Sequence, residues 1–196
     1  MDIFKIAAKI FVAEDRFAAD RFIPIFHRWI QNQAVEGHLL IDVADYAHVV
    51  AGPGTVLVSS QANFHMDRED GRLGLSYWRK SPLPGSFRDR LRATILETIK
   101  AAALLEREES LAGELAFRGE EIQIRLNDRL RAPASAATAA SLKPDFAAVA
   151  GELYGAGFSV EPRIVPHALL EFRLKSPKPL PLTALLDRLA ASAPSR

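Results

Sequence analysis

The residue types that carry acid–base and metal chemistry gather in one segment of the chain, residues 38–70. The histidines and aspartates of that segment considered for chemistry are His38, Asp42, Asp45, His48, His65 and Asp67. The 196-residue chain has no cysteine, which excludes disulfides, thiol nucleophiles, thiolate zinc sites and iron–sulfur clusters. Any chemistry therefore uses histidine, carboxylate, hydroxyl, lysine or arginine side chains.

If the protein is a catalyst, we expect acid–base catalysis by His48, His65 and Asp67. A histidine oriented by a carboxylate can take up and return a proton near neutral pH. His48 lies close to Asp45 in a predicted loop, and His65 lies two residues before Asp67. The chain has no G-x-S-x-G motif, so no nucleophilic triad is assigned.

The third function considered, after binding of a small anionic ligand and self-assembly, is that of a metal-dependent hydrolase, which would use His38, Asp42, His48 and His65. On a strand, His38 and Asp42 share a face but lie roughly 13 Å apart, too far to bind one ion directly. The spacing of the four residues matches no strong metal signature. We therefore expect no metal site, and we leave the cofactor unassigned.

Two other segments favour ligand binding. Residues 45–54 form a loop with a Gly-Pro-Gly cluster, which allows close approach of the backbone, although no phosphate-binding motif is present. Residues 125–129 stand at a predicted strand end, where arginines can hold a carboxylate or a phosphate. The expected ligand-binding residues are Asp45, Gly52, Gly54, Arg125, Asn127, Asp128 and Arg129.

Periodicity predicts the elements that position these residues. The expected strands are 3–13, 39–43, 55–60, 73–79, 114–128, 158–165 and 169–175, with 63–67 continuing the third after a bend and a turn at 119–120. The expected helices are 22–33, 86 to the stop signal at 111–113, 144–154 and 182–189. A capping box, Ser86-x-x-Asp89, opens the longest helix. The Ala-rich segment 131–140 is either a loop or a short helix.

This order predicts an α+β fold. A single globular domain, 1–196, would contain two βαββα-like units, 1–113 (β-α-β-β-β-α) and 114–196 (β-α-β-β-α), with antiparallel or mixed sheets and helices on one face. The arrangement resembles ferredoxin-like modules in general. That fold hosts enzymes, ligand sensors and assembly domains, so the resemblance implies no function.

The leading hypothesis is a protein that binds a small, anionic ligand in a cleft between the two units, with or without His/Asp catalysis. The alternative is a non-catalytic interaction module that forms a homo-oligomer, supported by the aromatic strand around Trp78. Net charge is +1 and no nucleic-acid motif is present, so we expect no nucleic-acid partner. Charged residues Asp2, Lys5 and Lys9 interrupt the first apolar segment, so we expect a cytoplasmic protein without a membrane partner.

Overall fold

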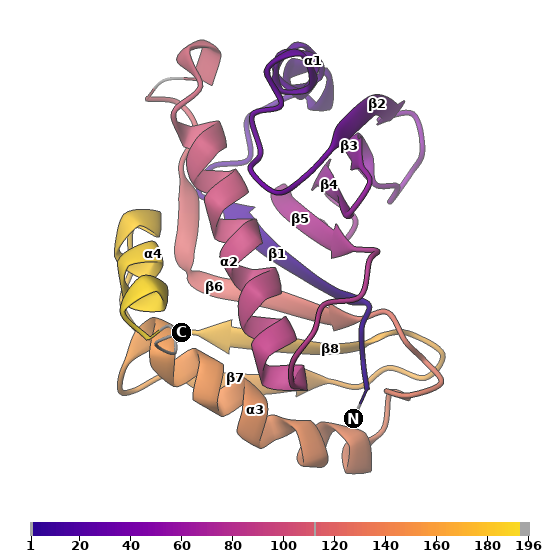
Figure 1. Ribbon diagram of the computed structural model, residues 1–196, viewed down its shortest axis with the longest axis vertical. Coiled ribbons are helices and arrows are strands. Elements are labelled where there is room, and N and C mark those ends of the chain that lie inside the picture. Colours follow the sequence, from indigo (N-terminus) through magenta and orange to yellow (C-terminus); the bar gives the residue numbers. More distant parts are fainter. Residues whose placement is uncertain (1, 112, 193–196) are drawn as a thin grey trace.

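The computed structural model describes residues 2–111 and 113–192, and these form one antiparallel sheet with helices (Figure 1). The strands are β1 (Ile6–Val12), β2 (Leu40–Tyr46), β3 (Gly54–Ser59), β4 (Ala62–Asp67), β5 (Gly74–Arg79), β6 (Phe117–Leu126), β7 (Ser159–Arg163) and β8 (Leu170–Lys175). Their order across the sheet is β2-β3-β4-β5-β1-β6-β8-β7. The predicted α+β class is confirmed.

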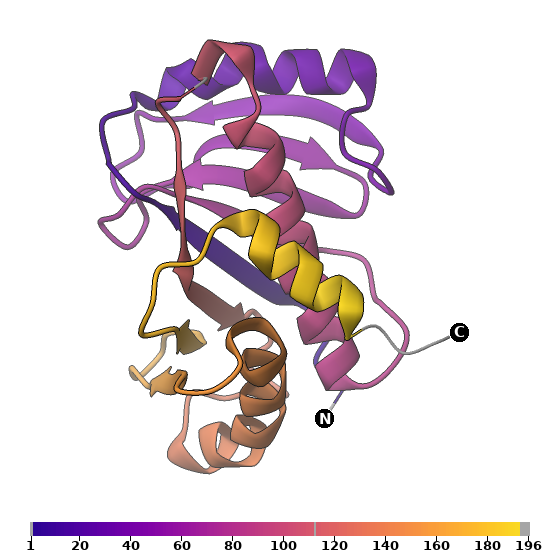
Figure 2. The ribbon, with the colours of Figure 1, turned by 90° about the vertical axis from the view of Figure 1, so that its left-hand side faces the viewer.

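Four helices of the described chain pack against this sheet. They are α1 (Ile23–Asn32), α2 (Phe87–Glu106), α3 (Ala136–Tyr154) and α4 (Leu182–Ala191), with short 3-10 turns at Ala19–Phe22 and Glu109–Leu111. The long α2 packs on β1 and β5, while α1 contacts β2 and α3 contacts β7 and β8. Figure 2 shows α2 running from the α3 end of the molecule to the α1 end. Of the stop signal at 111–113, residue 112 lies outside the described residues.

The core lies between the sheet and the helices. On β1, Ile6, Ala8 and Ile10 point into it, because side chains alternate between the two faces of a strand. The rings of Phe146 on α3 and Phe172 on β8 stack with centroids 3.8 Å apart. One continuous cluster of buried residues joins all four helices to the same face of the sheet. The opposite face, which we call the polar face, carries the side chains considered below.

The capping box predicted for the longest helix is confirmed. The Asp89 amide donates to Ser86 Oγ at 3.2 Å, and the Ser86 amide donates to Asp89 Oδ2 at 2.8 Å. These two hydrogen bonds satisfy backbone donors at the helix start that have no partner within the helix. The helix therefore begins where the sequence indicates.

Three local predictions are wrong. Residues 63–67 belong to a separate strand, β4, because Ser59 Oγ donates to the Ala62 carbonyl at 2.6 Å and closes a tight turn after β3. No turn interrupts β6 at 119–120; the strand is continuous there, with a register shift in its pairing with β1 between Phe117 and Ile122, and it pairs with β8 from Glu121 to Leu126. The helix α3 begins well before Pro144, because Ser135 caps the alanine-rich segment and alanine is the best helix former.

Candidate functional site

The polar face is built from one row of side chains across four strands. His65 pairs with Ser76, Ser76 with Lys9, and Lys9 with Gln123. Residues paired across antiparallel strands project to the same side of the sheet. In the next row, Trp78 pairs with Asn63 of β4 and with Ala7 of β1. Ala7 in turn pairs with Arg125 of β6. The centre of the sheet thus presents polar side chains on the side away from the core.

Lys9 is the most highly bonded side chain of this face. Its Nζ donates to Asp67 Oδ1 at 2.8 Å, to Asp70 Oδ1 at 2.6 Å and to the Arg72 carbonyl at 2.9 Å. Ser76 Oγ donates to the second oxygen of Asp67 at 2.6 Å. Burial by itself would raise the pKa of Asp70, but the hydrogen bond and charge of Lys9 hold that pKa below its usual value. Both carboxylate oxygens of Asp67 thus accept hydrogen bonds, one from Lys9 and the other from Ser76.

Residues 68–73, which join β4 to β5, lie over the polar face, and we call them the flap. Glu69 in the flap accepts from Arg125 Nη1 of β6 at 2.7 Å, and Arg72 donates to both carboxylate oxygens of Glu121 at 2.8 and 2.9 Å. With the Asp70 contact described above, the flap covers the middle of the sheet. As a result Lys9 is only 3% exposed although it faces away from the core.

An aromatic hollow of about 220 Å³ lies beside the flap. The rings of His65 and Trp78 form its floor, stacked at 18° with centroids 5.7 Å apart, and Ala51, Pro53 and Glu69 complete the lining. His65 Nε2 and Trp78 Nε1 are both buried, and neither has a hydrogen-bond partner in the part of the chain that the structure describes. Two unsatisfied polar atoms beside one hollow are unusual in a folded protein, where buried polar groups are paired.

His65 is neutral at physiological pH. Burial lowers its pKa from 6.5 to about 4, and the nearby charge of Asp67 only partly opposes this effect. Its ring can therefore accept or donate a hydrogen bond without carrying a charge. Because Asp67 is engaged elsewhere, His65 has no carboxylate hydrogen-bonded to it among the described residues.

Gln123 lies at the centre of the face, next to Trp78. It is 1% exposed, and within residues 2–111 and 113–192 neither its amide nitrogen nor its amide oxygen has a partner. It lines a cavity of about 10 Å³ together with Lys9, Trp78 and Arg125. A cavity of this size is at the lower limit for holding one water molecule.

An arginine hollow of about 320 Å³ lies on the other side of the flap. It is lined by Glu69, Arg125, Arg129, Arg163, Ala168, Leu169 and Glu171. Arg125 Nε and Arg163 Nη1 each lie 3.5 Å from Glu171 Oε2. Arg129 is exposed and forms no ion pair or hydrogen bond with any described residue. The two hollows share Glu69, and the small cavity beside Gln123 shares Trp78 with one and Arg125 with the other.

The structure brings several of the predicted site residues to this face. His65, Asp67, Arg125 and Arg129 all lie on it or at its rim. The 45–54 loop contributes Ala51 and Pro53 to the aromatic hollow rather than the residues singled out from the sequence.

Other predicted residues are used by the fold itself. Asp45 accepts from the Ala47 amide at 2.8 Å within the loop, and Asp128 accepts from the Arg131 amide at 3.0 Å in a turn. The backbone N–H of Asn127 donates to the Lys5 carbonyl at 2.8 Å, and His48 is exposed and lines neither hollow.

The two predicted glycines are explained by contacts within the chain. Gly54 has φ +63°, and a Cβ there would collide with the Met66 carbonyl of β4. A Cβ at Gly52 would lie 2.7 Å from the Val49 Cβ. Close approach of the backbone therefore occurs at both positions, but it is to neighbouring parts of the protein.

Lys9, Gln123, Arg163 and Glu69 were not predicted as site residues. Lys9 carried a signal, since it is a lysine in an otherwise apolar strand. Gln123 carried none, because its lack of partners depends on which strands become neighbours.

The residues of the metal hypothesis are not gathered in one place. His38 faces the core, where its Nε2 lies 3.0 Å from the Tyr77 hydroxyl, whereas His65 lies on the polar face. Over residues 2–111 and 113–192 no three histidine or carboxylate side chains are grouped so as to hold an ion.

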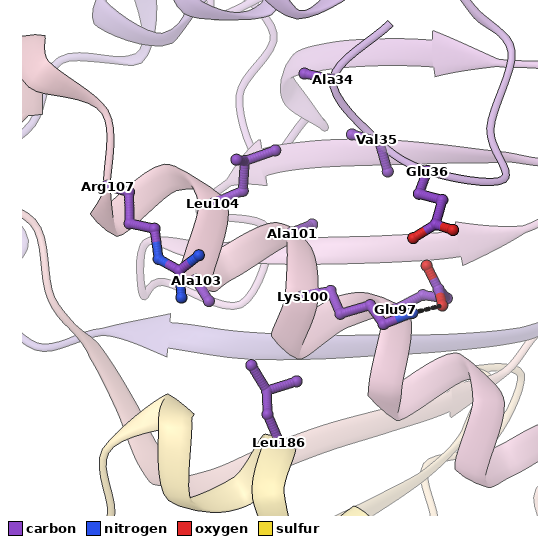
Figure 3. A pocket seen from close by; sticks show the side chains of 10 residues that line it. All are labelled: Ala34, Val35, Glu36, Glu97, Lys100, Ala101, Ala103, Leu104, Arg107 and Leu186. Carbon is purple, nitrogen blue, oxygen red and sulfur yellow. Dashed lines mark hydrogen bonds and ion pairs between the residues drawn. The ribbon is translucent and has the colours of Figure 1, made fainter. Parts of the chain in front are cut away.

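A further hollow, of about 230 Å³, lies between the α1–β2 connection, α2 and α4 (Figure 3). Leu104 and Leu186 contribute apolar lining, while the carboxylates of Glu36 and Glu97 point toward one another at one end. Lys100 Nζ pairs with Glu97 at 3.0 Å. None of the site residues predicted from the sequence lines this hollow.

Comparisons with protein-family models, with curated proteins and with solved structures returned no match. Among the described residues, no helix has both the length and the apolar character needed to cross a membrane.

Proposed function

We propose that this protein binds a small anionic ligand on the polar face, held by Arg125, Arg129 and Arg163. The observation that carries the proposal is Arg129, a guanidinium group without a partner among the described residues, in a hollow with two other arginines. Guanidinium groups bind carboxylates and phosphates through two parallel hydrogen bonds.

The charges of the arginine hollow favour a ligand of low charge. Three arginines and two glutamates line it, which leaves one positive charge. Glu171 is buried and contacts Arg125 and Arg163, so its carboxylate is a fixed part of the wall. Glu69 is exposed and is held by Arg125. A ligand with one carboxylate or phosphate group matches this balance.

The proposal retains the cleft between two units. Glu69 comes from the first half of the chain and Arg129 from the second, and both line the hollow.

We also propose that the second half, with β8 between β6 and β7, is a ferredoxin-like split β-α-β unit. If the bound ligand is transformed, His65 is the acid–base group, acting without Asp67. The cytoplasmic location expected from the sequence stays a prediction.

Isothermal titration with acetate, benzoate and inorganic phosphate tests the proposal. We expect at least one anion to bind, and Arg129→Gln to weaken that binding by about tenfold to a hundredfold, because a hydrogen bond to a charged group contributes roughly 1.5–3 kcal/mol. Arg107→Gln is the matched control, since Arg107 is an exposed arginine beside the hollow of Figure 3. Equal affinities of the Arg129→Gln and Arg107→Gln variants would contradict the assignment.

Self-assembly is a second candidate function, favoured by the edge strand β2. Leu39 next to this strand and Ile41 within it are 58% and 55% exposed. An unpaired strand edge with apolar side chains is a template for pairing with another chain. Sedimentation at several protein concentrations separates the two candidates, since self-assembly requires a mass that rises with concentration and falls in Ile41→Lys.

A further inference from the structure

We infer that the ligand of the polar face carries a planar, hydrogen-bonding ring beside its anionic group, and that this ring occupies the aromatic hollow. The inference depends on the proposed function, because it assigns a ligand class to the same face. It is carried by the composition of the hollow, by the buried atoms without partners that lie around it, and by the residue that the two hollows share.

The aromatic hollow has the shape and surface that a flat ring requires. The stacked His65 and Trp78 rings supply the aromatic lining of the hollow, and Pro53 and Ala51 supply apolar lining. A volume of about 220 Å³ accommodates a single heteroaromatic ring with a substituent. Stacking of a ring on an aromatic side chain is favourable for many kinds of ring, because all of them present a π face.

Two buried atoms of the floor side chains, which have no partner among the described residues, favour a ring that can form hydrogen bonds and that reaches them when these side chains shift to admit it. Trp78 Nε1 is a donor, and His65 Nε2 is a donor or an acceptor according to its tautomer. Gln123, whose two amide atoms are also unsatisfied, lines the small neighbouring cavity with Trp78 and does not line the aromatic hollow itself. Because His65 is neutral, the floor does not compete with the arginines for the anionic group.

Glu69 lies where the two hollows meet, and it determines how one ligand reaches both. Its carboxylate is bound to Arg125 at 2.7 Å and lines both hollows. A ligand with its ring on Trp78 brings its own anionic group to this position. That group replaces the Glu69 carboxylate on Arg125 and gains Arg129, which has no other partner among the described residues.

The test compares two anions of equal charge that differ in the ring. The ring of pyridine-3-carboxylate is planar and can accept a hydrogen bond, whereas the ring of cyclohexanecarboxylate is not planar and has no hydrogen-bonding atom. We expect the pyridine compound to bind about tenfold more tightly to the wild-type protein, and Trp78→Leu to abolish this preference. Trp29→Leu is the matched control, because Trp29 is the second of the two tryptophans and lies in the core on the opposite side of the sheet.

A second readout does not depend on the folding of any variant. The wild-type protein labelled with 5-fluorotryptophan gives one fluorine resonance for each tryptophan, and we expect only the Trp78 resonance to shift with pyridine-3-carboxylate. Equal affinity for the two anions, or no shift of Trp78 on binding, would overturn the ring inference while leaving an anion site that depends on Arg129. Failure of both anions and of phosphate to bind would overturn the proposed function together with the inference.

Discussion

His65 is the residue whose surroundings differ most from what its type suggests. A histidine beside an aspartate on one strand is typical of an acid–base pair, and the sequence favours that hypothesis for His65 and Asp67. In the structure Asp67 accepts hydrogen bonds from Lys9 and Ser76 instead, and burial keeps the imidazole of His65 neutral. A role for His65 stays a prediction, and the contacts of Asp67 could not be predicted because they come from β1 and β5.

The burial of His65 predicts a specific pH dependence of stability. The unfolded chain binds a proton at this residue below about pH 6.5, whereas the folded protein does so only near pH 4, so stability falls as the pH is lowered through this window. We expect His65 alone to remove about 2 kcal/mol of the free energy of unfolding between pH 7 and pH 5. Urea unfolding at the two pH values measures this, and His65→Gln should flatten the dependence by that amount.

The matched control for this experiment is His27→Gln. His27 is exposed on α1, so its replacement should leave the difference between pH 7 and pH 5 as it is in the wild-type protein. Parallel curves for the wild-type protein and His65→Gln would show that His65 is not held neutral by burial.

At the scale of elements, the flap decides how much of the polar face meets solvent. It is fastened at its two ends and its middle by charge pairs, Arg68 with Asp15, Arg72 with Glu121, and Lys9 with Asp70. Gly74 of β5 lies close to β1, since a Cβ at this position would lie 2.5 Å from the Ile10 carbonyl oxygen and 2.7 Å from the Lys9 Cε. The sequence predicts the hairpin turn, but it does not show that the turn lies over the sheet.

Removing the central fastening should destabilise the protein strongly. We expect Lys9→Met to lower the free energy of unfolding by about 3–5 kcal/mol, because it leaves Asp67 and Asp70 buried without their cation. Urea unfolding at pH 7 measures the loss. Lys5→Met is the control, since Lys5 is exposed on the same segment and its change should stay within about 0.5 kcal/mol. Similar losses in the two variants would mean that Lys9 does not anchor the flap.

At the scale of the whole molecule, both halves of the chain contribute to one sheet and one core. The opening strands β1 and β6 of the two halves pair with each other, and α2 contacts both α3 and α4. Phe87 on α2 meets Phe146 on α3 with ring centroids 5.7 Å apart. The sequence predicts the class and most elements from local periodicity. It does not predict the strand order, because β1 pairs with strands that follow it by more than 60 and more than 100 residues.

This shared core predicts that the chain unfolds as one unit, in line with the single domain expected from the sequence. Both tryptophans lie in the first half, whereas circular dichroism in the far ultraviolet also reports α3 and α4. We expect the two signals to give the same midpoint in urea, as cooperative unfolding requires. A second transition seen by circular dichroism alone would identify the second half as an independent domain.

The ion pair between Glu69 and Arg125 raises the concentration of an external anion that is needed to occupy the proposed site. A carboxylate tethered by a short flap is present at its target at a constant effective concentration, however dilute the protein is. Under the proposed function, Glu69 is therefore a built-in competitor of any external anion that uses Arg125. The occupancy of the proposed site would then depend on the flap as well as on the affinity of the arginines, so that scarce anions leave Glu69 on Arg125 and abundant ones replace it.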